Sequence, residues 1–370
     1  MSAFTRQIME ERVMKRISIL LLIVVLSLMA AGCGAITPDT AVVDDIQYLP
    51  TEVSIPEEAS EENSEEPADE STEPGQRTIN IGVSIYKFDD CYMTLVRNDM
   101  SDYIESLGRK HAANYSITIL DGRGDHLEQY KHVDDFIARG VDVMIINLVQ
   151  TSLANVVTEK AKAAGIPVVY LNREPGEEDL NAWDKICYVG TNPRQSGTFQ
   201  GEIVRDLPDN GDADGDGVVR YVMIMGDPEN ADAQYRTELP IKALTDAGIQ
   251  VECLFQQRGD WEQSKGQEIA SSALAQFGSK VDVIFCNNDG MAMGAILAIQ
   301  AAGRVVGDDI YLVGIDAIPE AIDAITACNM TGTVLSDNIG QAHTAIDAAL
   351  RYAYGEKNDT YIWVDYVKVG

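Results

Sequence analysis

Short apolar runs alternate with amphipathic stretches along the chain from about residue 78 onward. Ile79, Ile81, Val83 and Ile85 alternate with polar neighbours, as in a half-buried strand. Further apolar runs follow at 117–120, 141–146, 167–171, 218–225, 249–255, 281–286, 310–313 and 333–335. Stretches with helical period lie between them at 126–138, 152–164, 262–277 and 291–302. This alternation predicts an α/β fold with parallel strands and helices on both sides of the sheet.

A weak internal repeat indicates that the fold has two halves. The segment 141–147 reads VDVMIIN, and the segment 281–287 reads VDVIFCN. The chain from Arg77 to the end is also long enough for two domains of ordinary size. We therefore predict two similar doubly wound lobes.

The N-terminus has the features of an export signal. Lys15 and Arg16 precede an apolar run at 17–31, which Gly32 and Cys33 close. This pattern predicts a signal peptide over residues 1–32, with Cys33 as the lipidated first residue of a lipoprotein held outside the cell membrane. An uncleaved membrane anchor is the alternative, although the run is short for a span. Met14 is an alternative start.

An acidic segment separates this signal from the periodic part of the chain. Between Asp39 and Glu73 lie 13 acidic residues and no Lys or Arg. Such a composition cannot bury enough apolar surface to fold, so residues 33–76 are interpreted as a disordered spacer, with an acidic interaction tail as the alternative. The whole chain carries a net charge of −31, which argues against nucleic acid as a partner.

Polar residues follow the apolar runs at the predicted ends of the strands. Open α/β sheets bind ligands at the carboxyl ends of their strands. The residues at these positions are Asp89-Asp90, Asn172-Arg173-Glu174, Asn287-Asn288-Asp289, Asp316 and Ser336-Asp337-Asn338. Each of them alone is better explained as a helix cap, but their common position favours a site. Paired acceptors and donors of this kind suit a ring of vicinal hydroxyls.

Two aromatic residues and one ion pair complete a candidate sugar site. Tyr92 and Trp261 offer flat rings for the C–H face of a pyranose. Asp232 and Arg236 lie four residues apart and share one face of a predicted helix. The alternative for this pair is a surface salt bridge of little energetic weight.

Several ungapped blocks of the chain resemble the galactose/glucose-binding proteins of bacterial sugar uptake. The blocks are IGVSIYKFDD at 81–90, IPVVYLNREP at 166–175, NNDGMAMGA at 287–295, GIDAIPEA at 314–321 and GTVL at 332–335. They run in order over nearly the whole chain after residue 77. The resemblance implies a periplasmic binding protein type I fold. It divides the chain into one lobe of 77–190 plus 338–365 and a second of 191–337 plus 366–370, joined by three crossings near Thr191, Asp337 and the last residues.

The resemblance also assigns roles to individual residues. The positions that match hydrogen-bonding residues of the family are Asp90, Asn172, Asp232, Arg236, Asn288 and Asp316. Tyr92 and Trp261 match the two rings that sandwich the sugar. Asn230 stands where the family has a histidine, Ser336 where it has an asparagine, and Tyr92 where it has a phenylalanine. These departures bear on which hexose is bound, whether galactose, glucose or a methyl galactoside.

A calcium site is the second feature that the family implies. Asp212, Asp214 and Asp216 occupy positions 1, 3 and 5 of a loop with EF-hand spacing. Val218 is expected to offer its carbonyl, and Asp282 matches the family's remote carboxylate. Arg220 departs from the pattern at position 9, where the family has a neutral ligand. A plain Asp/Gly turn without metal is the alternative.

The expected function is capture of a hexose without chemical change. By the resemblance, the partners are an ABC transporter permease and a chemotaxis receptor, and the protein acts as a monomer. Three rivals remain: a glycoside hydrolase using Asp90 and Asp316, the sugar-sensing core of a repressor, and a binding protein for pentoses, inositol or a signalling furanose. Five cysteines follow Cys33, and we expect mostly buried thiols rather than a disulfide framework.

Overall fold

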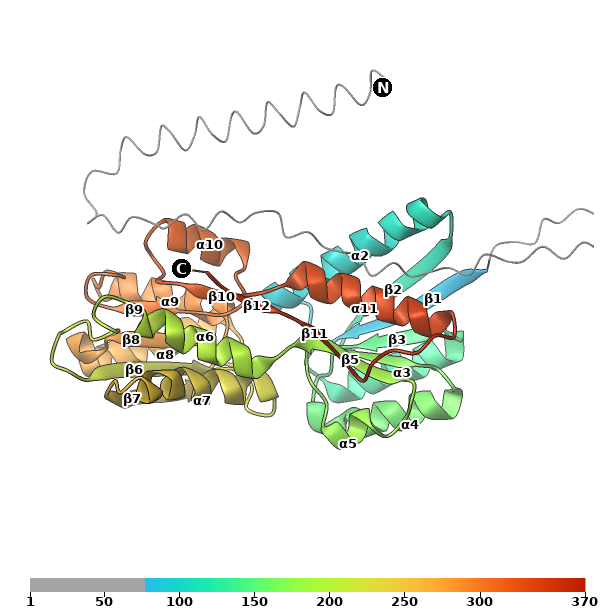
Figure 1. Cartoon of the computed structure of the whole chain (residues 1–370), viewed down its shortest axis with the longest axis horizontal. Coiled ribbons are helices and arrows are strands. Elements are labelled where there is room, and N and C mark those ends of the chain that lie inside the picture. The colour runs from blue at the N-terminus through green and yellow to red at the C-terminus, as the bar shows by residue number, and fades with distance from the viewer. Residues whose placement is uncertain (1–76, 370) are drawn as a thin grey trace, which may run out of the picture. The chain divides into compact units, whose positions relative to one another are not determined.

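Two parallel β-sheets organise residues 77–369, which are the residues that the computed structural model describes (Figure 1). The predicted signal peptide, Cys33 and the whole acidic spacer lie outside this range. Within residues 77–369, none of the helices combines the length and apolar character that a membrane span requires.

The first sheet has six parallel strands in the order β11-β5-β4-β3-β1-β2. The strands are β1 (Thr78–Ile85), β2 (Asn114–Asp121), β3 (Val143–Ile146), β4 (Val168–Leu171), β5 (Ile186–Thr191) and β11 (Tyr361–Val364). The apolar runs of β3 and β4 are buried on both faces, as expected for central parallel strands. This is why these segments lack the alternation seen in β1.

Helices cover both faces of the first sheet. Helices α2 (Cys91–His111) and α11 (Asn338–Ala353) pack together on one face, over a core that includes Ile81 and Ile346. Helices α3 (His126–Arg139) and α4 (Ala154–Ala164) cover the other face, over a core that includes Phe136. The 3₁₀ turn η1 (Thr151–Leu153) precedes α4, and the short helix α5 (Glu177–Leu180) follows β4.

The second sheet has four parallel strands in the order β7-β6-β8-β9. They are β6 (Val219–Met225), β7 (Val251–Arg258), β8 (Val283–Cys286) and β9 (Tyr311–Val313). An antiparallel pair, β10 (Thr333–Ser336) and β12 (Tyr366–Val369), lies beside it, linked by bridges from Val313 to Gly332 and from Asp316 to Leu335.

The helices of the second lobe also cover both faces. Helices α6 (Pro193–Arg205) and α7 (Ala231–Asp246) pack on one face, and α8 (Gln263–Phe277) and α9 (Asp289–Ala301) pack on the other. The 3₁₀ turn η2 (Gly278–Lys280) follows α8, and α10 (Pro319–Thr326) follows β9. Helices α8 and α9 lie very close, because a Cβ atom at Gly294 would lie 2.0 Å from the carbonyl oxygen of Gln263. The prediction of two doubly wound α/β lobes is confirmed.

The chain passes between the sheets at three places. The segment after β5 enters α6, the segment after β10 enters α11, and Asp365 separates β11 of the first sheet from β12 beside the second (Figure 1). The strands and helices expected from periodicity all form, but the sequence pattern alone did not reveal α2, α5, α6, α10, α11, β5, β11 or β12.

The expectation of mostly buried cysteines is wrong. All five cysteines in the described part of the chain are free thiols, but only Cys187 and Cys286 are buried. Cys253 is exposed because its strand, β7, forms the edge of the second sheet. Cys91 lies at the start of α2 and Cys328 follows α10, and both are exposed there.

Candidate ligand-binding site

A polar pocket lies between residues of the two lobes. It is lined by Tyr86, Asp90, Tyr92, Met93, Asn172, Arg173, Asn230, Asp232, Arg236, Trp261, Asn288 and Asp316. Nine of the ten side chains predicted to bind a sugar are in this set, and Ser336 is the exception. Residues separated by more than 200 positions along the chain therefore meet at one place. Small-molecule pockets are usually concave and mostly apolar, so the polar lining sets this pocket apart.

Three of these residues begin helices. Asp90 caps α2 by accepting a hydrogen bond from the backbone N–H of Met93 at 2.7 Å. Asn230 caps α7 and Asn288 caps α9 in the same way. The capping alternative is therefore correct for Asp90 and Asn288, and all three residues also line the pocket. One side-chain oxygen of each satisfies the helix, while the other oxygen of Asp90 accepts from Tyr86 and the amide nitrogen of Asn288 donates to the carbonyl oxygen of Trp261.

The backbone is left-handed at three other pocket residues. The φ angle is 66° at Asn172, 70° at Trp261 and 127° at Asp316. Residues other than glycine rarely adopt such angles, because the Cβ atom collides with the neighbouring backbone. The surrounding fold maintains these strained backbone conformations, and the three residues that have them all line the pocket.

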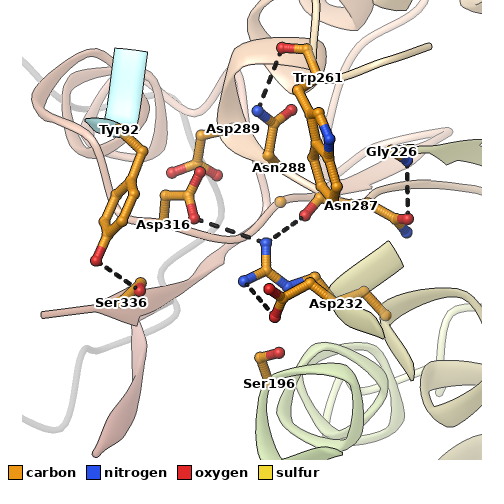
Figure 2. Close-up of polar contacts among 12 residues, drawn as sticks. Tyr92, Ser196, Gly226, Asp232, Trp261, Asn287, Asn288, Asp289, Asp316 and Ser336 are labelled. Carbon is orange, nitrogen blue, oxygen red and sulfur yellow. Dashed lines mark hydrogen bonds and ion pairs between the residues drawn. The ribbon is translucent and has the colours of Figure 1, made fainter. Parts of the chain in front are cut away.

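Arg236 is the cation that lies between two carboxylates of the pocket. It donates to the carbonyl oxygen of Asn287 at 3.0 Å and to the hydroxyl of Tyr366 at 2.8 Å. Its guanidinium also lies 3.2 Å from Asp232 and 3.8 Å from Asp316. Figure 2 shows these two carboxylates with their dashed contacts. All three charged side chains are at least nine-tenths buried, so the surface-pair alternative for Asp232 and Arg236 is wrong.

Burial shifts the ionisation of the acidic residues. Desolvation raises the pKa of Asp316 well above its usual range, and the carboxylate of Asp289 adds to this while Arg236 opposes it. Desolvation also raises the pKa of Asp232, against the attraction of Arg236 and Arg173. Arg173 is on the first lobe and Asp232 on the second, so this attraction acts across the cleft. A ligand hydroxyl that donates to these oxygens would replace part of the water that burial removed.

Asp289 lies behind Asp316 and gives a prediction about pH. Burial raises the pKa of Asp289 from 3.8 to about 6, although the hydroxyl of Thr333 and the backbone N–H of Ile318 donate to it. Below about pH 6 the folded protein therefore takes up a proton that the unfolded chain does not. From about pH 7 to about pH 5, we expect this residue to increase the free energy of unfolding by about 1 kcal/mol. Urea denaturation at several pH values measures the effect.

The matched variant is Asp289→Asn, in which this increase should be absent. Burial lowers the pKa of His132 and of His343, so these two groups reduce stability as the pH falls below about 6.5. Both proteins keep these histidines, so the difference between their pH profiles isolates Asp289. Parallel profiles would show that Asp289 does not take up the proton.

The two aromatic residues are held in different ways. The hydroxyl of Tyr92 accepts hydrogen bonds from Ser336 at 2.9 Å and from Gln341 at 2.7 Å (Figure 2). The indole of Trp261 lies directly against Gly226, where a Cβ atom would lie 2.1 Å from the ring. Its Nε1 is buried and has no hydrogen-bond partner among the described residues. Trp261 thus keeps an unsatisfied donor beside the pocket.

Ser336 does not reach the pocket. It ends β10 and is fully buried, and its hydroxyl is engaged by Tyr92 and Gln341. Its prediction as a ligand residue rested on its place at the end of an apolar run and on the family position. In this chain the hydroxyl of Ser336 donates to the hydroxyl of Tyr92. Ser336 therefore positions the aromatic ring.

Two polar lining residues, Tyr86 and Arg173, were missed from the predicted set. Tyr86 donates to Asp90 at 2.6 Å, and the guanidinium of Arg173 stacks 3.6 Å above the ring of Tyr86. Arg173 also donates to the carbonyl oxygens of Leu148 and Val149. The signal was present in the sequence, because both residues stand at strand ends within the similar blocks. Together they fix the orientation of Asp90.

The acidic loop before β6 gathers three carboxylates away from the pocket. One oxygen of each of Asp212, Asp214 and Asp216 lies within 4.8 Å of the others. Asp282 lies next to this loop and is completely buried. Burial raises the pKa of Asp282 to about 6, the backbone N–H of Arg220 opposes the shift, and the carboxylates of Asp214 and Asp212 add to it. The structure thus supports an acidic triad able to hold a cation.

Comparison with known proteins supports the family resemblance over most of the chain. The periplasmic binding protein domain family matches residues 81–357. A D-galactose/methyl-galactoside binding periplasmic protein of Haemophilus influenzae is 33% identical over 75% of this chain and 82% of its own length. A putative rhizopine-binding protein of Rhizobium meliloti is 35% identical over 77% of this chain and 88% of its own.

Solved structures share the fold. An ABC transporter solute binding protein from Bacillus halodurans, with bound myo-inositol, superposes with a TM-score of 0.69 and 28% identity, over 81% of this chain and 96% of that one. A galactofuranose binding protein superposes with a TM-score of 0.70 and 24% identity, over 78% and 94% of the two chains. With the family model matching about three quarters of the sequence, this chain belongs to the periplasmic binding protein family, a family of solute-binding proteins and not of enzymes.

Proposed function

We propose that this protein captures a monosaccharide between its lobes and delivers it to the permease of an ABC uptake system. The observation that carries this proposal is the pocket itself. Carboxylates and amides from both lobes face one cavity, and two aromatic rings, Tyr92 and Trp261, line it. Hydroxyl groups pair with such acceptors and donors, while the C–H face of a sugar ring packs on an aromatic plane.

Hinge closure is the proposed mechanism. We assign residues 77–190 plus 338–365 to one lobe and 191–337 plus 366–370 to the other, with the three crossings as the hinge. Direct polar contacts between the lobes include Thr151 donating to the carbonyl oxygen of Glu229 at 3.0 Å, Ser336 donating to the hydroxyl of Tyr92 at 2.9 Å, and Lys87 lying 3.9 Å from Glu262. A ligand that contacts both lobes would stabilise the closed state by its differential affinity.

A hexose is the proposed ligand class, with galactose, glucose or a methyl galactoside as the first candidates. The relative from Haemophilus influenzae is named for D-galactose and methyl galactoside, which supports this choice. Inositols and furanoses are the second candidates, because a structure with 28% identity holds myo-inositol. Asn230 bears on which hexose is bound, because its side-chain oxygen already accepts a hydrogen bond from the backbone N–H of Asp232.

A calorimetric titration series tests the proposal directly. We expect saturable one-to-one binding to at least one of galactose, glucose, a methyl galactoside, ribose, arabinose and myo-inositol. Incubation with nitrophenyl glycosides should release no nitrophenol above background. Absence of binding to every compound, or turnover of a glycoside, would contradict the proposal. Asp232→Asn serves as the matched variant, because it keeps the side-chain shape and removes one buried charge.

The N-terminal signal supports a membrane-anchored location. We propose that Cys33 carries the lipid, that residues 33–76 act as a spacer, and that a chemotaxis receptor is a further partner besides the permease. Expression of Cys33→Ser should move the protein from the membrane fraction to the soluble extracytoplasmic fraction, because the covalent anchor is lost. Retention of the variant in the membrane fraction would favour an uncleaved apolar anchor instead.

Calcium is the proposed cation for the acidic loop. Asp212, Asp214, Asp216 and Asp282 offer carboxylate oxygens, and Val218 offers its carbonyl, which is the donor chemistry that calcium prefers. An orphaned buried oxygen of Asp282 supports the fit. Bound calcium would offset part of the negative charge of the loop, and a site beside β6, away from the pocket, suits a structural role rather than a part in ligand binding.

A further inference from the structure

The acidic loop already contains a cation of its own, the guanidinium of Arg220. Its Nη1 lies 2.7 Å from Asp216 and 3.8 Å from Asp214, and its Nε donates to Glu252 at 3.1 Å. The side chain is only 18% exposed, although it is long, charged and at the surface end of β6. One arginine therefore joins two of the three loop carboxylates to a neighbouring strand.

The inner side of the loop lacks such a partner. Asp282 is completely buried, and its Oδ2 accepts from the backbone N–H of Arg220 at 2.7 Å. Its Oδ1 is buried without a hydrogen-bond partner among the described residues. A buried carboxylate oxygen in that state is costly unless a cation or a donor reaches it. This orphaned oxygen is a second observation, separate from the clustering of acids, that points to an ion at the loop.

The loop keeps its shape through bonds that need no metal. Asp212 accepts from the backbone N–H groups of Gly215 and Gly217, and Asp214 accepts from that of Asp216. Asp216 accepts from that of Val218. These hydrogen bonds use one oxygen, Oδ1, of each carboxylate of Asp214 and Asp216. Their other oxygens face Arg220, so an incoming ion and the guanidinium would compete for the same atoms.

We propose that Arg220 acts as a tethered cation in the acidic loop and competes there with the divalent ion. Without metal, the guanidinium offsets the repulsion among the carboxylates and keeps the loop folded. With metal, Arg220 must leave Asp214 and Asp216, and a positive charge beside the ion weakens its binding. The protein thereby becomes less dependent on the ion for its stability. Only the competition between Arg220 and the divalent ion rests on the proposed calcium site; the role of Arg220 as counter-charge does not.

The experiment compares Arg220→Gln with the full-length protein, each in chelator and in calcium. In chelator we expect Arg220→Gln to melt about 2 °C or more below the parent protein, because the carboxylates lose their counter-charge. Calcium should restore the variant more than it raises the parent. In calorimetric titrations the variant should bind calcium about tenfold more tightly or better.

Two further variants keep the test specific. Arg220→Lys retains one positive charge and should melt close to the parent in chelator. Arg139→Gln removes an exposed arginine paired with Asp135 on the first lobe, and should change neither the calcium affinity nor the response to chelator.

The possible failures are distinguishable. If Arg220→Gln melts like the parent in chelator, the guanidinium is not the counter-charge of the loop and the inference is wrong. Equal calcium affinity of variant and parent would refute the competition. If neither protein binds calcium, the calcium proposal fails, while the melting temperatures in chelator still decide the role of Arg220. None of these outcomes bears on sugar binding.

Discussion

Replacement of Arg236 by methionine is expected to abolish ligand binding and to lower the free energy of unfolding by about 3–5 kcal/mol. The reason is the burial of its partners. Asp232 and Asp316 are both less than one-tenth exposed, and Arg236 is the cation that approaches each of them within 4 Å among the described residues. Without it, two carboxylates remain in a desolvated site. Urea denaturation measures the loss of stability, and calorimetry measures the loss of binding.

A double variant separates charge from packing. Adding Asp232→Asn to Arg236→Met removes one uncompensated charge and should recover part of the lost stability, but not the affinity. Arg139→Met, which removes an exposed arginine, should cost less than about 1 kcal/mol. If Arg236→Met were as stable as Arg139→Met, the buried ion pairs would contribute no more to the free energy of unfolding than an exposed pair does.

Truncation of Trp261 to alanine is expected to weaken ligand binding by about 1–3 kcal/mol, or about 5- to 150-fold. Trp261 lines the pocket, and its indole N–H has no partner among the described residues. The truncation therefore removes both an aromatic plane and a donor that a ligand oxygen would satisfy. Titration with the best ligand from the sugar series measures the change.

Gly226→Ala tests the same contact from the backbone side. An added methyl group would collide with the indole of Trp261, so the ring must move and affinity should fall even though no ligand contact is deleted. Trp363→Ala is the control, because Trp363 is 44% exposed on β11 and stacks on Tyr361 rather than lining the pocket. Unchanged affinity in both Trp261→Ala and Gly226→Ala would remove this ring from the site.

Most of the candidate site followed from one rule applied to the sequence. Ligands of open α/β sheets lie at the carboxyl ends of the strands, so Asp90, Asn172, Asn288 and Asp316 could be selected from their positions alone. The roles of Asp232, Arg236 and Trp261 needed the resemblance as well. The rule also picked out Arg173 together with Asn172 and Glu174, but neither argument gave it a role, because its place in the chain does not distinguish it from those two polar neighbours.

The sequence by itself determined the alternation of strands and helices, the two lobes and the chemistry of the pocket, because period and residue type act locally along the chain. Only the tertiary structure decided which polar groups are buried together. It turned Asp232 and Arg236 from a possible surface pair into a buried centre, and it placed Ser336 behind Tyr92. It also left Cys253 exposed on an edge strand. Burial depends on which segments pack against each other across the whole fold, and no local pattern records that.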